Sequence, residues 1–399
     1  MYCNKNKSFQ GTVVLGTGFI LDSKEAADLI RKSDLNRQVI FPYLTGDDLN
    51  NSPNQMAGRQ IINFSDWDEN ESKKYRDCYS ILVEKVKPQR DEIIAKGKQI
   101  HTYNFWHYWD PRPNLYSTIS KLKRVLVVNN HTRHCVFDFV DPRHIFSHAL
   151  TVIAFEDYNY FSILSSNVFS EWAWKRGSTM GSTTLRFTSS EIFEPFPFPQ
   201  NINPHEEQKL EIIGKAYHDH RTQFMLSIQL GLTKTYNAFH AKGIHSSITT
   251  QQLKQSDKKT IEKQYGKEVW NLWNHLQKTE DTCSIEEAID GIVKLRELHV
   301  QMDNAVLEAY GWSDMALRHD FYEVDYLPEN DRTRFTIHPD ARKEVLKRLL
   351  ELNHQIHEEE VKAGLWDKKG GKKKGYIGND EVSRVDEPDE SLGGLWEQK

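Results

Sequence analysis

The first 200 residues alternate short apolar runs with turn-forming residues, a pattern typical of mixed α and β structure. Runs rich in β-branched and aromatic side chains predict four strands, at 59–64, 124–130, 134–140 and 149–155. Two helices are also predicted, a short one over 23–33 with Ser23 as its cap and a buried one over 158–175. Four prolines between 191 and 204 remove hydrogen-bond donors, so this segment is expected to be a linker.

From Pro204 onward the apolar positions follow a helical period. Pro204 suits the first turn of a helix, and Ser284 with Glu287 gives a capping-box pattern at the start of another. A last amphipathic helix is expected over 339–363. A further helical face is formed by Ile261, Tyr265, Val269, Leu272 and Leu276.

These patterns predict an α+β fold. Residues 1–200 are expected to form a mixed α/β domain, and residues 201–365 an all-α domain. Residues 366–399 are rich in glycine, lysine and acidic side chains, which predicts a disordered tail.

Charge is distributed unevenly along the chain. The 399 residues carry a net charge of −5, yet residues 72–133 hold 13 Lys and Arg against 5 Asp and Glu, a local +8. Aromatic residues are threaded through the end of this basic region, among them Trp106, Trp109 and Tyr116. Basic side chains neutralise phosphates, whereas Arg, Asn and His at a turn reach base edges, so the region is a candidate DNA contact. The alternative, in which the aromatics are core and the lysines solvated, stays open.

The cellular setting follows from what the sequence contains. The four cysteines are widely scattered without a CxxC motif, which favours a reducing compartment over a disulfide framework or a zinc ribbon. The N-terminal stretch MYCNKNKSFQ has no apolar core, and no run of 18 apolar residues occurs. We therefore expect a cytoplasmic protein without a membrane partner.

Enzyme motifs are weak in this sequence. None of the 13 prolines is followed by another, so the (D/N/S)PP(Y/F/W) loop of amino-methylating enzymes is absent, and LGTGF at 15–19 lacks the βαβ context of a cofactor turn. Asp340, Glu360 and Lys362 match the spelling of a metal-dependent nuclease, but all three fall in one predicted amphipathic helix, where a solvated charged face is the favoured interpretation. The sequence therefore assigns no catalytic, cofactor-binding or metal-binding residue.

Several long blocks, in this order, resemble MmeI-like restriction–modification enzymes. The blocks are FPYLTGDDLN (41–50), LSSNVFSEWAW (164–174), LRFTSSEIFEPFPFP (185–199), MDNAVLEAYGW (302–312) and TIHPDARKEVLKRLLELN (336–353). They are similar to the target-recognition region and the helical C-terminal region of these adenine-specific DNA methyltransferases, over about residues 10–365. The resemblance implies that double-stranded DNA is a partner. It also implies that the S-adenosylmethionine-binding module is supplied in trans or has been lost, because this chain lacks its motifs.

On this resemblance, residues 41–67 are scaffold. Asp47, Asp48, Asn50 and Asn51 are expected to make turns at the entry to the recognition sheet. The side chains expected in its core are Phe41, Tyr43, Phe64 and Trp67. For Arg59, a position facing DNA and one at the core edge both stay open.

The candidate DNA contacts fall in two loops and one basic segment. The predicted base-reading residues are Asn129, Asn130, His131, Thr132 and Arg133, with Thr183, Thr184 and Arg186 from the Ser- and Thr-rich loop 177–190. The predicted phosphate contacts are Lys121, Lys123 and Arg124. Two other hypotheses remain, an intrinsic magnesium-dependent nuclease and a helical assembly subunit without DNA specificity of its own.

Overall fold

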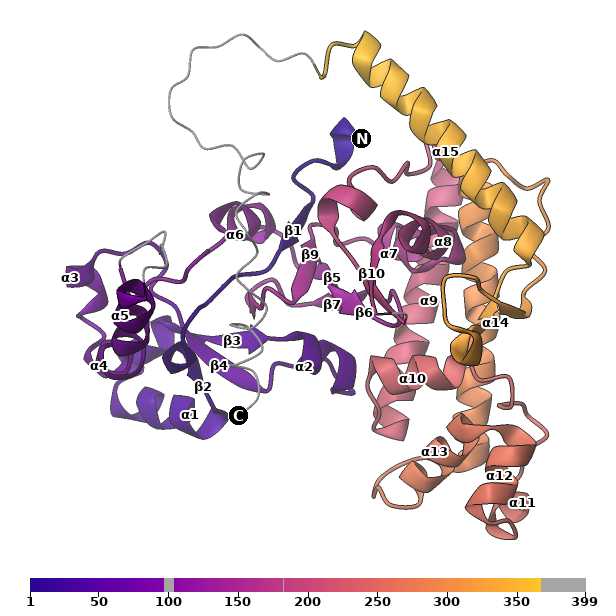
Figure 1. Cartoon of the computed structure of the whole chain (residues 1–399), viewed down its shortest axis with the longest axis horizontal. Helices are drawn as coiled ribbons and strands as arrows, with labels where there is room; N and C mark the ends of the chain where they lie inside the picture. Colours follow the sequence, from indigo (N-terminus) through magenta and orange to yellow (C-terminus); the bar gives the residue numbers. More distant parts are fainter. Residues whose placement is uncertain (97–103, 182, 367–399) are drawn as a thin grey trace.

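The computed structural model describes residues 1–96, 104–181 and 183–366, and it has the α+β fold that the sequence predicts. Small sheets occupy the N-terminal half, and the long helices α9, α14 and α15 lie in the C-terminal half (Figure 1). The tail predicted beyond residue 366 lies outside the described residues.

In the parts of the chain that the structure describes, the N-terminal half contains three small sheets. The first is antiparallel, in the order β1 (Ser8–Gln10), β9 (Leu150–Ile153), β5 (Val125–Asn129) and β7 (Asp138–Val140). The second has the order β2 (Ile20–Leu21), β4 (Arg59–Ile62), β3 (Ile40–Leu44) and β8 (Ile145–Phe146), with β3 and β8 parallel. The third has the order β10 (Ser178–Met180), β11 (Thr184–Arg186) and β6 (His131–Thr132).

Helices surround these sheets and form most of the C-terminal half. Those of the first 200 residues are α1 (Ser23–Lys32), α2 (Gly46–Asn51), α3 (Glu69–Ser72), α4 (Arg76–Lys85), α5 (Lys87–Ala95), α6 (Pro113–Ile119), α7 (Tyr158–Ser165) and α8 (Asn167–Arg176). The later ones are α9 (Pro204–Ile228), α10 (Leu232–Phe239), α11 (Thr250–Lys254), α12 (Lys258–Tyr265), α13 (Lys267–Leu276), α14 (Ile285–Ala309) and α15 (Pro339–Lys362). A hairpin of β12 (Asp320–Glu323) and β13 (Thr333–Thr336) precedes α15.

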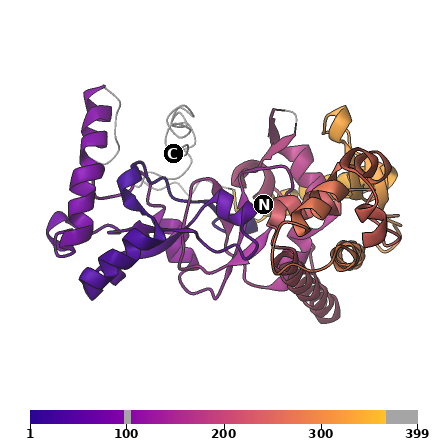
Figure 2. The same cartoon turned by 90° about the horizontal axis from the view of Figure 1, so that it is seen from below.

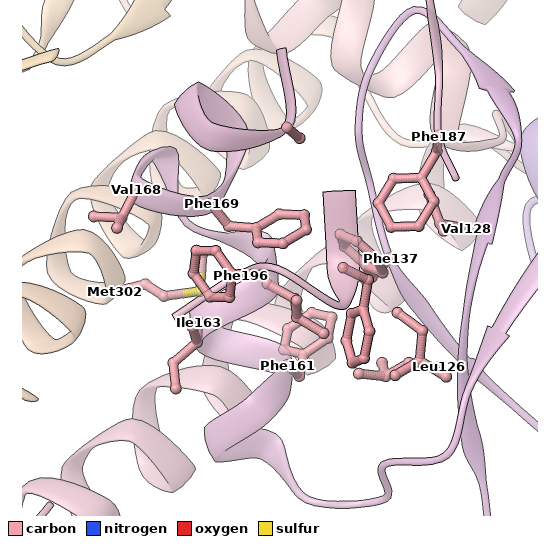
Figure 3. Packing of buried hydrophobic residues seen from close by; sticks show 14 of the residues in the cluster. Leu126, Val128, Phe137, Phe161, Ile163, Val168, Phe169, Phe187, Phe196 and Met302 are labelled. Carbon is pink, nitrogen blue, oxygen red and sulfur yellow. The ribbon is translucent and has the colours of Figure 1, made fainter. Parts of the chain in front are cut away.

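The largest hydrophobic core joins the first sheet to the long helices. Leu126 and Val128 of β5 belong to the same buried cluster as Phe161 of α7, Phe169 of α8 and Met302 of α14 (Figure 3). This cluster continues into α15 through Val345 and Leu349. Residue 200 therefore marks a change of secondary structure, while one apolar core extends across it.

Two smaller cores lie at opposite ends of the molecule. The second sheet packs with α1 and α4 around Phe19, Leu82 and Phe64. Tyr43 and Phe64 are buried, and Phe41 and Trp67 are partly buried against the same cluster, so the expected core of residues 41–67 is confirmed. The other small core joins α12, α13 and the start of α14 through Ile261, Leu272 and Ile289.

The element boundaries follow local capping chemistry. Asn203 caps α9, in which Pro204 is the first residue, and Ser284 with Glu287 forms the predicted capping box of α14. The cap predicted for α1 was wrong by one residue: Asp22, not Ser23, accepts the backbone N–H of Glu25.

Three predicted elements differ from the structure. The helix expected over 158–175 is two helices, because Ser166 is extended and caps α8. The helical face from Ile261 to Leu276 is divided at Gly266, whose φ of 92° breaks the helix. Residues 46–51 form the helix α2 instead of turns, since Thr45 and Asp48 close a capping box there.

A buried ion pair fastens the first sheet to α9. Oδ1 of Asp138, the first residue of β7, lies 3.0 Å from Arg221 Nη2 in a salt bridge and accepts a hydrogen bond from His218 Nε2, also at 3.0 Å. Arg221 is fully buried, and its Nη2 also donates to the carbonyl of Phe137 at 2.9 Å. Burial alone would raise the pKa of Asp138, but the charge of Arg221 and the contact with His218 outweigh it, so its pKa lies below 3.8.

We expect Arg221→Met to lower the free energy of unfolding by about 3–5 kcal/mol, since it leaves the Asp138 carboxylate buried without its cation. Chemical denaturation monitored by circular dichroism measures this change. Arg37→Ala is the control. Arg37 and its partner Asp34 are both exposed, so the loss of this ion pair should leave the unfolding transition unchanged. Equal effects of the two substitutions would contradict the structural role of Arg221.

The free energy of unfolding depends on pH because the pKa of Asp138 is lowered in the folded state. Its ionised form stabilises the fold above about pH 4, and this contribution is lost as pH falls through the pKa of the folded state. In Asp138→Asn, unfolding free energies measured between about pH 5 and pH 3 should fall less steeply than in the unmodified protein. An unchanged slope would show that other carboxylates dominate acid unfolding.

Candidate nucleic-acid interface

The two predicted base-reading loops meet in the third sheet. His131 lies opposite Arg186, and Thr132 lies opposite Leu185, in antiparallel register. Directly opposed residues of two antiparallel strands have side chains on the same face. The structure therefore places the side chains of His131 and Arg186 next to one another, although they lie 55 positions apart along the chain.

The β10–β11 hairpin is anchored at its base and exposed along its arm. Leu185 is fully buried, and a Cβ at Gly177 would lie only 2.6 Å from Leu185 Cδ1, so the arm begins tightly packed. All three residues of β10 are exposed. At the turn, Gly181 has a φ of 63°, and no described atom lies within 4 Å of where its Cβ would stand. The hairpin thus projects from the body of the molecule (Figure 2).

Three of the predicted base-reading residues hold the turn between β5 and β6. Asn130 is buried; its Nδ2 donates to the carbonyl of His148 at 2.8 Å, and its Oδ1 accepts from Thr151 Oγ1 at 2.6 Å. Asn129 Nδ2 donates to the carbonyl of Gly46 at 3.3 Å. Thr132 is buried, and its hydroxyl accepts the backbone N–H of His134 at 3.2 Å. In this conformation these side chains fix backbone geometry.

The other predicted base-reading residues are more accessible. The Arg133 side chain is 42% exposed, and His131, Thr183, Thr184 and Arg186 are half-buried. Each lies in β6, in β11 or directly beside one of these strands. The accessible polar side chains of both loops therefore gather around one small sheet.

Residues of the helical half pack against the same turn. His134 Nε2 lies 2.8 Å from Asn237 Oδ1 of α10, and its ring stacks on that of His240. Burial lowers the pKa of His134 to about 3, so its imidazole is neutral at physiological pH. Beside it, Arg133 pairs with Asp331 of the β12–β13 connection. A small cavity of about 60 Å³ lies behind the turn, lined by residues that include His134, Asn167 and Tyr236.

The three predicted phosphate contacts differ in their surroundings. Lys121 and Lys123 are exposed. Arg124 is half-buried, with its guanidinium carbon 3.9 Å from the ring centroids of both Phe139 and Tyr158. Its Nε donates to the carbonyl of Glu156 at 2.7 Å, so much of the Arg124 side chain is used inside the fold.

The nuclease hypothesis is wrong on geometry. Asp340 lies in the first turn of α15 and Glu360 in its last, so about 30 Å of helix separates them. Glu360 instead accepts the backbone N–H of Tyr2 at 2.5 Å and the indole N–H of Trp366 at 3.1 Å. Among the described residues, no group of three or more His, Cys, Asp or Glu is placed to hold a metal ion.

Sequence reasoning missed two features of this region. Lys175 and Arg176 end α8 and are exposed shortly before β10. The sequence did offer a signal for them, since a basic pair precedes the Ser- and Thr-rich loop. Asp331 and Arg334 gave none, because they come from the helical half and reach the turn only through folding.

None of the helices in the described parts of the chain combines the length and the apolar character needed to cross a membrane. No protein-family model matches the chain, and no curated protein matches its sequence. Among solved structures, the chain is similar to the type IIL restriction–modification enzyme MmeI in complex with DNA, with a TM-score of 0.55 and 14% sequence identity. The match covers 88% of this chain and 36% of that one, so this chain spans about a third of the length of MmeI. The chain thus has a fold like that of part of a restriction–modification enzyme.

Proposed function

We propose that this chain recognises a specific DNA sequence for an adenine-specific DNA methyltransferase of a restriction–modification system. The catalytic module, with its S-adenosylmethionine, is supplied by polypeptide outside these 399 residues. The observation that carries the proposal is the meeting of two polar, basic loops in one small sheet, His131 opposite Arg186. The fold likeness to an enzyme solved with DNA supports it.

The shape of the third sheet suits a DNA groove. A two-stranded ribbon fits the major groove, which is about 12 Å wide and displays a distinct pattern of donors and acceptors for each base pair. The β10–β11 arm is such a ribbon, and its exposed strand carries Ser178 and Thr179. Arg186 and Arg133 supply guanidinium groups, which pair preferentially with guanine.

The proposal divides the predicted residues into three roles. Base reading is assigned to His131, Arg133, Thr183, Thr184 and Arg186, and phosphate contact to Lys121 and Lys123. A supporting role is assigned to Asn129, Asn130, Thr132 and Arg124, whose polar atoms are used within the fold. Asn129, Asn130 and Thr132 fix the turn that carries His131 and Arg133, so these two residues are positioned before DNA arrives.

The assembly-subunit hypothesis receives less support. The helical half shares a core with the first sheet, and Arg221 of α9 lies in a buried ion pair with β7. Both halves therefore form one unit, in which α9 and α14 support the recognition sheets.

The proposal is tested by selecting bound duplexes from random DNA with the purified chain at low salt. A defined sequence motif is expected, with no methyl transfer from S-adenosylmethionine by the chain alone. Binding without any enriched motif, or no binding at low ionic strength, would overturn the proposal.

We expect Arg186→Ala to relax base preference at one position of the selected motif. Loss of one bidentate base contact costs about 1–3 kcal/mol of discrimination. Competition binding with duplexes that differ at single base pairs measures the effect. Arg37→Ala, which removes the exposed Arg37–Asp34 ion pair of the N-terminal half, serves as the control. An equal loss of affinity for all duplexes would assign Arg186 to phosphate contact instead.

The double substitution Lys121→Ala/Lys123→Ala should weaken binding to all sequences alike. Each lost phosphate contact reduces the slope of log affinity against log salt by about 1, so a combined change of about 2 is expected. Lys259→Ala/Lys263→Ala, which removes two exposed lysines of α12, is the matched control and should leave the slope unchanged. Equal slopes in all three proteins would exclude Lys121 and Lys123 from the DNA contact.

A further inference from the structure

Arg133 is held by a residue of the opposite half of the chain. Its guanidinium Nη2 pairs with Asp331 Oδ1, and the two residues lie 198 positions apart in sequence. Asp331 ends the short helical turn Glu329–Asp331 between β12 and β13. The Arg133 side chain is 42% exposed and that of Asp331 only 21%, so the carboxylate is the more buried partner of the pair.

A second arginine fixes the carboxylate. Arg334 is buried, and its Nη1 donates to the backbone carbonyls of Asp331 at 2.7 Å and of Thr333 at 2.9 Å. The same guanidinium contacts both carboxylate oxygens, Oδ1 at 3.3 Å from Nη1 and Oδ2 at 3.2 Å from Nη2. Asp331 therefore has a fixed position before it meets Arg133.

The charges of this group leave Arg133 available for a ligand. Burial would raise the pKa of Asp331, but Arg334 and Arg133 together lower it, so the acid is ionised at neutral pH. Two guanidinium groups and one carboxylate carry a net charge of +1. A guanidinium has five N–H donors, and the contact described with Asp331 engages Nη2 alone. The remaining donors suit an acceptor pair on one base.

We propose that Asp331 is a positioning residue that orients Arg133 to read a guanine, so that the helical half helps to set DNA specificity. This inference rests on the proposed function. A guanine presents O6 and N7 as two acceptors in the major groove, and reading both requires the guanidinium plane to be aligned with the base. An arginine anchored at one nitrogen by a fixed carboxylate loses less freedom on binding than an unanchored one.

The experiment compares motifs selected from random DNA by the unmodified chain, Arg133→Ala, Asp331→Asn and the double variant. We expect Arg133→Ala to lose the preference for guanine at one position. Asp331→Asn should weaken that same preference about 3- to 10-fold and leave the other positions unchanged. The double variant should match Arg133→Ala, because the two residues act through one contact.

Asp314→Asn is the matched control. Asp314 accepts from Arg348 Nη1 at 2.8 Å and Nη2 at 2.6 Å, a comparable Asp–Arg pair within the helical half. It should leave the motif unchanged. Arg133→Lys adds an independent measurement, since it keeps the charge of an accessible side chain without the planar fork and should lose the same guanine preference.

The outcomes separate this inference from the proposed function. If the unmodified chain selects no motif, the proposed function fails and this inference fails with it. If it selects a motif but Asp331→Asn strengthens binding to every sequence equally, Asp331 only neutralises Arg133, and the positioning role is overturned. A guanine preference lost in Arg133→Ala but retained in both Asp331→Asn and Arg133→Lys also overturns it.

Discussion

The arrangement of the surface around β6 and β11 depends on one buried ion pair, that of Asp138 with Arg221. A guanidinium without solvent exposure needs its carboxylate, because an uncompensated charge in the protein interior is very costly. Asp138 begins β7, directly after the segment that contains β6, and Arg221 lies within the long helix α9. This pair therefore prevents the first sheet from shifting along α9, and it fixes one end of the turn that carries His131 and Arg133.

The other end of the turn is fixed by a different kind of contact. The amide of Asn130 bridges His148 and Thr151, so the chain leaves β5 in a defined direction. Between these two anchors, the only strand pairing of β6 in the described residues is with β11 of the hairpin. Buried contacts therefore fix the backbone on both sides of β6, and β6 itself pairs with β11. The side chains of these two strands keep their spacing, and His131 and Arg186 stay partly accessible.

Local chemistry made much of the fold predictable. Pro204, and Ser284 with Glu287, marked helix starts because caps satisfy backbone donors within a few residues. The apolar runs at 124–130 and 149–155 contained the two central strands of the first sheet for a similar reason, since burial on both faces requires continuous apolar residues. Segments with competing local signals were harder: Ser166 and Gly266 broke helices that apolar periodicity alone had joined.

The candidate site was only partly predictable. Both loops were identified from their polar and basic residues, but their pairing was not, because strands of two or three residues carry too little pattern to fix a register. Nothing near Arg133 in sequence indicated Asp331, which approaches it only when the β12–β13 connection packs on the N-terminal half. The nuclease alternative at Asp340, Glu360 and Lys362 is excluded by α15 itself, because one continuous helix keeps Asp340 and Glu360 near its opposite ends.

The anchored hairpin has a consequence for evolution. Its base, with Leu185 and Gly177, belongs to the hydrophobic core, whereas the strand Ser178–Met180 lies outside it. Substitutions along that strand therefore change the chemistry offered to a partner at little expense in folding free energy. This arm can therefore change residue by residue with less effect on stability than the packed scaffold beneath it.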